Sequence, residues 1–150
     1  MLHKSNVGSK GELTILLKKA TGDNEVYEFK NLAVSTGLNF IVSRMKEDTD
    51  AVMSHMSVGE GTTAADLGDI TLESEIAGSR VALTSTTVTG NTITYVATFE
   101  PGVGTGAVTE SGIFNDGTAG TMLCRTVFPV VNKQPGDSMT VNWTVTISNA

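Results

Sequence analysis

The sequence predicts a mainly β domain, either an antiparallel β-sandwich or a barrel-like domain, with one short amphipathic helix at about residues 36–47. Strand formers and turn formers dominate the 150 residues, with 22 Thr, 16 Val and 16 Gly. Segments in which polar and apolar residues alternate recur between turn signals, as in all-β folds. We expect a short N-terminal arm at residues 1–10 and a single β-rich domain over residues 11–150.

The clearest strand lies near the C-terminal end, in the stretch SMTVNWTVTIS. Period-two alternation places one set of side chains in a core and the other set in water. The expected core set is Met139, Val141, Trp143, Val145 and Ile147, and the expected solvent set is Thr140, Asn142, Thr144, Thr146 and Ser148.

Three hairpins are expected upstream of this strand. Gly90-Asn91 tolerates the positive φ of a two-residue turn, so residues 80–99 read as two paired strands. The stretch ATGDN joins a strand at residues 13–17 to one at 26–29, and NDGTAG joins 107–114 to 121–128. A further strand is expected around Met53 and Met56, and Pro129 and Pro135 are expected to bracket a connection.

One segment has helical spacing. Its apolar residues recur at intervals of three and four, and Ser35 or Thr36 is available as the N-cap. The apolar set is Leu38, Ile41, Val42 and Met45. We expect this helix to lie on the β core.

The charge is divided unevenly along the chain. Residues 1–46 hold 7 basic and 4 acidic residues, whereas residues 47–150 hold 3 basic and 12 acidic ones. An acidic surface repels nucleic acid, and no apolar run approaches the roughly 20 residues of a membrane span, so neither partner is expected. The basic arm is expected to bind an acidic partner surface through Leu2, His3, Lys4 and Lys10.

The stretch SVGEGTTAAD, residues 57–66, contains a G-x-G pair that suggests a phosphate loop. Such a loop needs a following lysine, and the next lysine is Lys133, so the two glycines are predicted to form a bend. The carboxylates after it are predicted to be a solvated acidic face: Asp66, Asp69, Glu73 and Glu75. Cys124 is expected to be buried, and no catalytic, cofactor-binding or metal-binding set is predicted.

Two arginines stand in strand surroundings. A turn centred near residue 118 places facing residues at positions that sum to about 236, so Glu110 and Arg125 are predicted to form a cross-strand ion pair. Arg80 opens the second hairpin, and whether it acts within the domain or at a partner interface stays open; we name it as a candidate partner-binding residue.

The order of several phrases resembles a group of small virion proteins of tailed bacteriophages. The resemblance covers about residues 31–148, and its most specific pieces are VTESGIFN and RTVFPVVNK followed by the Thr-rich closing strand. Other pieces are NLAVSTGLNFIVSRM and SVGEGTTAAD leading to TLESEIAGSR. None of these is a catalytic motif, so the resemblance implies a non-enzymatic structural protein.

The shared phrases do not separate head decoration proteins from tail or fibre components of that group. A compact acidic domain with a short, mildly basic arm favours a capsid decoration (cement) protein on the outer head surface, made in the host bacterial cytoplasm. Its partners would be the major capsid protein and further copies of itself, with a trimer favoured. The alternative is a tail-tip, baseplate or fibre-attachment protein, but the chain carries no long shaft or repeat. A carbohydrate-binding or hydrolytic β domain is the weakest reading, because Trp143, Tyr95 and Phe99 fall on predicted core faces.

Overall fold

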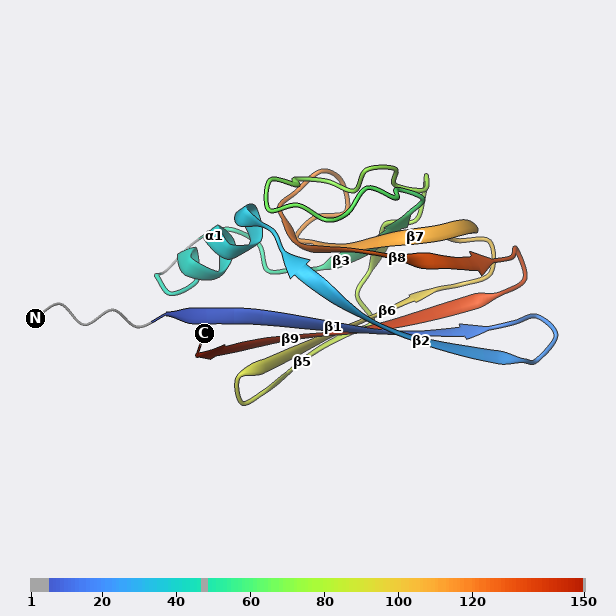
Figure 1. Cartoon of the computed structure of the whole chain (residues 1–150), viewed down its shortest axis with the longest axis horizontal. Helices are drawn as coiled ribbons and strands as arrows, with labels where there is room; N and C mark the ends of the chain where they lie inside the picture. The colour runs from blue at the N-terminus through green and yellow to red at the C-terminus, as the bar shows by residue number, and fades with distance from the viewer. Residues whose placement is uncertain (1–5, 47–48, 150) are drawn as a thin grey trace, which may run out of the picture.

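The computed structural model describes residues 6–46 and 49–149, and it is mainly β, as predicted. Nine strands form one antiparallel sheet in the order β4-β3-β7-β8-β2-β1-β9-β6-β5 (Figure 1). Their bounds are β1 Val7–Lys18, β2 Asn24–Ala33, β3 His55–Gly59, β4 Val81–Ala82, β5 Ser85–Thr89, β6 Thr92–Phe99, β7 Gly106–Phe114, β8 Met122–Lys133 and β9 Ser138–Asn149. One helix, α1 (Ser35–Ser43), follows β2.

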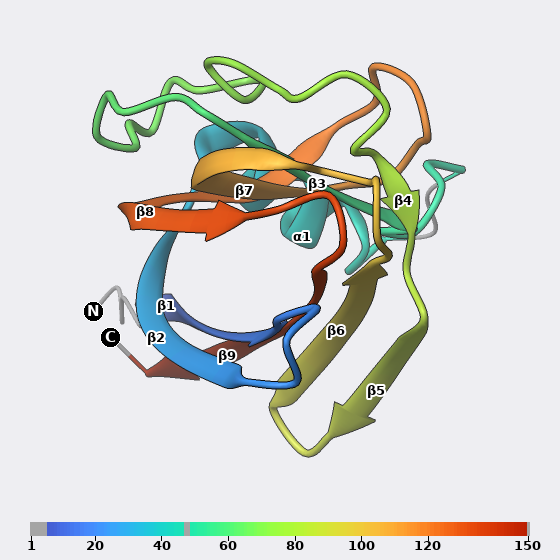
Figure 2. The same ribbon diagram turned by 90° about the vertical axis from the view of Figure 1, so that its right-hand side faces the viewer.

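The sheet curls into a half-barrel because two segments cross from one half to the other (Figure 2). Strand β2 pairs with β1 over most of its length, and its last two residues, Leu32 and Ala33, pair with β8. On the other side β4 and β5 stand at opposite ends of the strand order, although only Leu83 and Thr84 separate them. These two residues donate backbone hydrogen bonds to Ser54 and Val96, one on each half.

The core fills the space between the two halves. The predicted inward set of β9 is buried at Met139, Val141, Trp143 and Val145, with Ile147 half-buried. Side chains of β1, β6, β3 and β7 complete the same cluster: Leu13, Ile15, Leu17, Tyr95, Ala97, Phe99, Met56, Val58 and Ile113. Burial of this apolar surface is the main term that holds the two halves together.

The three hairpins are confirmed. Gly90 has φ 57° at the β5–β6 turn, which is the conformation a two-residue hairpin requires. Strands β1 and β2 pair from Gly11 to Lys18, and β7 pairs with β8 across the predicted turn.

Two element boundaries differ from the sequence prediction. Helix α1 ends at Ser43, and its N-cap is Val34 with no side-chain cap bond. Thr36 is unavailable as a cap because its hydroxyl donates to the Met122 carbonyl. Strand β8 continues through Pro129 to Lys133, because this proline lies beside a register shift between Val108 and Glu110, where the ladder needs no N–H.

Residues 7–10 of the predicted N-terminal arm belong to a strand. Strand β1 begins at Val7, and residues 7–10 pair with residues 146–149 of β9, so they belong to the sheet. Of the four expected partner-binding residues of the arm, Lys10 is exposed on β1, and Leu2, His3 and Lys4 lie outside the described residues.

Segment 60–80 runs between β3 and β4 and lies over the outer face of β3, β7 and β8 (Figure 1). We call these residues the covering segment. Its Leu72 is buried against Val34, Phe114 and Met122 in a second, smaller apolar cluster. Few of its residues belong to regular structure, and it is held by side-chain contacts together with a few backbone bonds, such as that from Ile76 N–H to the Val58 carbonyl.

Candidate functional site

The predicted ion pair is present and buried. Glu110 on β7 is fully inaccessible, Arg125 on β8 is 2% exposed, and Arg125 Nε lies 2.9 Å from Glu110 Oε2. In the register Glu110 faces Val127 and Arg125 faces Gly112, so the two side chains meet diagonally across the strand pair.

The Glu110 carboxylate also accepts three backbone hydrogen bonds from the covering segment. Gly61 and Ser74 donate their N–H groups to Oε1 at 3.0 and 2.7 Å, and Glu73 donates to Oε2 at 3.0 Å. A buried carboxylate is tolerable when it is paired and fully hydrogen-bonded. Glu110 therefore binds the covering segment to the sheet at two places, near residue 61 and at residues 73–74.

Arg125 extends the same network outward. Its NH1 donates to Asp69 Oδ2 at 2.7 Å, and its NH2 donates to the Thr63 carbonyl at 3.0 Å and lies 3.9 Å from Glu73. Partial burial opposes ionisation of Asp69, but the Asp66 N–H and the Arg125 guanidinium outweigh it and lower the pKa of Asp69. The prediction of a solvated acidic face is therefore wrong at Asp69, which binds a buried cation, whereas Glu73 is exposed.

The glycines of the G-x-G pair have a steric role. A Cβ on Gly59 would lie 2.4 Å from Glu110 Oε1 and 2.5 Å from the Ser74 carbonyl oxygen. A Cβ on Gly61 would lie 2.6 Å from the same Glu110 oxygen. The stretch SVGEGTTAAD is thus a bend, as predicted, and its glycines make room for a buried carboxylate from another strand.

Arg80 fastens the far end of the covering segment. Its Nε and NH2 donate to the two Glu75 oxygens at 2.9 and 2.8 Å, and its NH1 donates to the Ala119 carbonyl at 2.6 Å. The guanidinium carbon lies 3.6 Å from the centroid of the Phe114 ring. Arg80 thereby links the segment to the β7–β8 turn within one chain, and partner binding by Arg80 stays a prediction.

A second buried cluster joins three turns at the opposite end of the molecule. Lys133 Nζ donates to the carbonyls of Asp137 at 2.7 Å and Glu100 at 3.1 Å. The Asp137 carboxylate accepts the N–H groups of Ala20 and Gln134, each at 2.9 Å, and these bonds lower its pKa. Burial lowers the pKa of Lys133, although both neighbouring acids oppose this shift.

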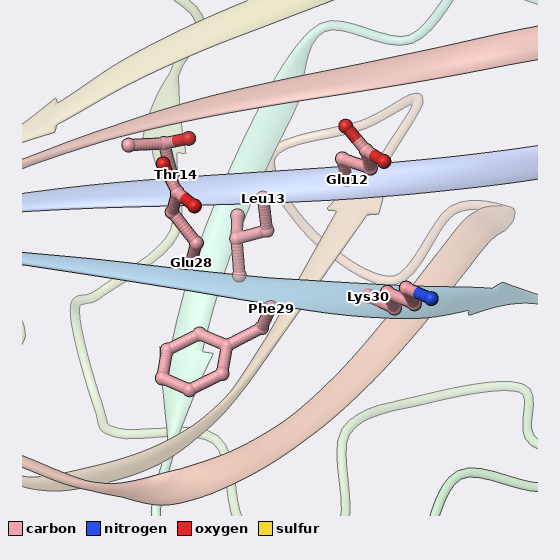
Figure 3. Close-up of a pocket in the computed structure, with 6 residues that line it drawn as sticks. All are labelled: Glu12, Leu13, Thr14, Glu28, Phe29 and Lys30. Carbon is pink, nitrogen blue, oxygen red and sulfur yellow. The ribbon is translucent and has the colours of Figure 1, made fainter.

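Several pockets lie on the described residues, and one of about 320 Å³, with Lys30, Thr62 and Arg125 in its wall, lies beside the Glu110–Arg125 pair. One of about 360 Å³ lies where β1 and β2 pair, and Figure 3 shows its lining from two triplets, Glu12–Thr14 and Glu28–Lys30. Another, of about 340 Å³, lies between α1 and the β5–β6 hairpin, with Phe40, Val52, Ile93 and Tyr95 in its wall.

Within residues 6–46 and 49–149, no group of three or more His, Cys, Asp or Glu side chains is arranged to hold a metal ion. In the part of the chain that the structure describes, no helix is long and apolar enough to cross a membrane. Cys124 is buried as predicted, and burial raises the pKa of its thiol.

Comparisons with family models, curated proteins and solved structures found no match. The observations on the chain itself therefore carry the functional argument. The buried charged side chains among the described residues are Glu110, Arg125, Lys133 and Asp137, and each of them is hydrogen-bonded within the chain.

Several exposed apolar residues gather at one end of the molecule, whereas Val26, Leu67, Ile70 and Val130 are exposed on other elements. Helix α1, the start of β1 and the β5–β6 turn all lie at this end (Figure 1). Val7 and Val88 are more than two thirds exposed, Met45 is 86% exposed, and Val42 and Val52 are similarly open. Exposed apolar surface of this kind is typical of protein contacts.

Proposed function

We propose that this protein is a non-enzymatic structural component of a tailed-bacteriophage virion, a decoration protein that binds the major capsid protein on the outside of the head. One observation carries the proposal: the phrases that resemble the phage group meet in the Glu110 cluster. SVGEGTTAAD contributes Gly59 and Gly61, TLESEIAGSR contributes Glu73, VTESGIFN contributes Glu110, and RTVFPVVNK contributes Arg125.

This convergence supports a structural role. Phrases that belong to an enzyme family usually meet at a cleft where polar groups face a substrate. In this protein the phrases meet under the covering segment, and the charged groups at their centre, Glu110 and Arg125, form hydrogen bonds within the chain. These bonds hold the covering segment in one position on the outside of the sheet. A protein that binds other proteins needs an outer surface of this kind.

Decoration requires contact area and copy number. A specific protein contact commonly buries about 1,200–2,000 Å² in total, and many weakly bound copies add their effect on a shell. The end with the exposed apolar residues offers surface for such a contact, and the negative charge of the chain, −6, disfavours contact with packaged nucleic acid.

The deciding experiment is the position and copy number of this chain in purified particles. Quantitative mass spectrometry against the major capsid protein, with labelled antibody to locate the chain by electron microscopy, is expected to give hundreds of copies on the head. Three, six or twelve copies at the tail would overturn the decoration role in favour of the tail alternative. Absence from particles would overturn both.

A binding assay adds a mechanistic arm. Purified protein is mixed with particles that lack it, and bound protein is separated by sedimentation. Saturable binding to tailless heads is expected, whereas binding to isolated tails alone would contradict head decoration. Release of sugar from a host glycan by the purified chain would contradict the non-enzymatic assignment.

A further inference from the structure

Strand β5 is an open edge of the sheet. It stands at the end of the strand order and pairs only with β6, and all five of its residues, Ser85–Thr89, are exposed. Val88 is 69% exposed. An edge strand presents unpaired N–H and C=O groups that can pair with another chain.

This edge lacks the devices that usually protect such strands. The sequence from Val81 to Phe99 contains no charged residue and no proline. The β5–β6 register runs without a shift from Ser85 to Thr89, so no bulge turns the edge away. By contrast, β4 at the other end of the order has only two residues, and a very short edge is itself a protection.

The β5 edge suits pairing with a copy of itself. Its residues, Ser85–Thr89, form an extended, exposed strand of mostly β-branched residues without a charge. Although each copy carries a net charge of −6, no like charges therefore face each other where two such edges meet. We propose that β5 pairs antiparallel with β5 of a second copy, extending the sheet across a two-fold axis.

The hairpin sets the register of this pairing. Thr89 and Thr92 close a two-residue turn, so the backbone groups of Thr89, Thr87 and Ser85 point to β6. The backbone groups of Thr86 and Val88 consequently point to the free edge. Antiparallel pairing places Thr86 of one copy opposite Val88 of the other, with Thr87 on the axis.

The side chains suit the same register. Thr86 faces Tyr95 and Val88 faces Ile93 across the β5–β6 pair, so both lie on the side of the apolar groove beside Phe40. Pairing brings Val88 of the second copy beside Thr86 and removes exposed apolar surface from water. Main-chain bonds and an adjoining apolar groove together are the features of strand addition.

This contact stands independently of the proposed function. A two-fold contact uses the same patch on both copies and closes as a dimer. The sequence resemblance favours a trimer, and a measurement of mass in solution distinguishes the two. Failure of the contact would leave head decoration untouched, since particle position is measured separately.

The first test measures mass against concentration by sedimentation equilibrium for the full chain and two matched variants. Val88→Lys places an ammonium in the joint, whereas Val26→Lys makes the same change at a 63% exposed position on β2, distant from the edge in the strand order. Dimers are expected, with dissociation at least about tenfold easier in Val88→Lys and unchanged in Val26→Lys.

A second test fixes the register by oxidation. In the proposed dimer Thr87 faces Thr87 of the second copy as a non-hydrogen-bonded pair, with Cα atoms about 4.5 Å apart, within the range of a disulfide. Thr87→Cys is expected to form a covalent dimer. Thr89→Cys is the control, since the two copies of position 89 lie about 13 Å apart along the strand.

Three results would overturn the proposal. One is a monomer at every concentration together with no cross-linking of Thr87→Cys. Another is an assembly that Val88→Lys weakens no more than Val26→Lys does, and this includes a trimer built on another face. The last is equal cross-linking at positions 87 and 89. Melting temperatures equal to wild type establish that each variant is folded.

Discussion

Replacing Glu110 with Gln tests whether the buried cluster holds the covering segment on the sheet. The exchange keeps the side-chain shape, removes the charge and turns one acceptor oxygen into an NH2 donor. If the NH2 replaces Oε1, it faces the N–H groups of Gly61 and Ser74. If it replaces Oε2, it faces the N–H of Glu73 and the guanidinium of Arg125.

The expected loss of stability follows from these contacts. Two hydrogen bonds to a charged acceptor disappear in either orientation, at about 1.5–3 kcal/mol each. This estimate agrees with the loss of about 3–5 kcal/mol that is typical when one partner of a buried ion pair is removed. We therefore expect Glu110→Gln to lower the free energy of unfolding by about 3–5 kcal/mol and the melting temperature by about 6–20 °C.

Urea unfolding followed by tryptophan fluorescence measures this loss. Trp143 is the single tryptophan and is fully buried, so its emission reports the core directly. Glu28→Gln is the matched control on an exposed strand position, with a change expected within about 0.5 kcal/mol. Limited proteolysis within the covering segment is expected to accelerate in Glu110→Gln alone.

A double-mutant cycle separates the pair from its surroundings. Arg125→Met and the double variant complete the cycle, and a coupling of about 0.5–3 kcal/mol is expected between two groups in direct contact. A loss in Glu110→Gln no larger than in Glu28→Gln, or a coupling of zero, would refute the claim that this ion pair organises the loop.

Three further predictions follow from the same structure. Gly61→Ala is expected to lower the free energy of unfolding in urea by about 1–3 kcal/mol, because the added Cβ overpacks against the buried Glu110 carboxylate. Gly68→Ala is the control and should cost less, since its added Cβ meets its nearest atom at 3.2 Å. Equal losses in the two variants would contradict the steric role of Gly61. The lowered pKa of Asp137 means that the unfolded chain binds the proton first, so this stabilisation is present above about pH 3.8 and lost as pH falls through the lower folded value. Asp137→Asn should therefore have a lower melting temperature at pH 7, and its melting temperature should fall less than that of the wild type as the pH is lowered. An unchanged pH dependence of the melting temperature would contradict this. Deleting residues 1–5 should weaken binding to particles and leave the melting temperature unchanged. Deleting residues 1–10 should also lower the melting temperature, because residues 7–10 pair with β9. Full particle binding by the shorter deletion would contradict a docking role for the arm.

Local pattern determined much of this fold. Period-two alternation identified the inward residues of β9 and β6, because neighbouring side chains of a strand point to opposite faces whatever the rest of the chain does. Gly90-Asn91 identified a hairpin because its turn needs backbone conformations that few residue pairs accept. Hairpin symmetry was also enough to bring Glu110 near Arg125, since the predicted turn centre agrees to within one residue with the register around them, although β7 and β8 shift register at two points.

The tertiary structure decided what lies far apart in the sequence. The curl depends on β2 and on residues 81–89 crossing between halves, and no local pattern specifies which strands they meet. The steric roles of Gly59 and Gly61 depend on the Glu110 carboxylate, about fifty positions away in the sequence. The acidic stretch reaches Arg125 only because the covering segment lies over β7 and β8. Alternation and turns are short-range steric effects that the sequence displays directly, whereas packing partners are chosen by the burial of the whole chain, which only the folded structure displays.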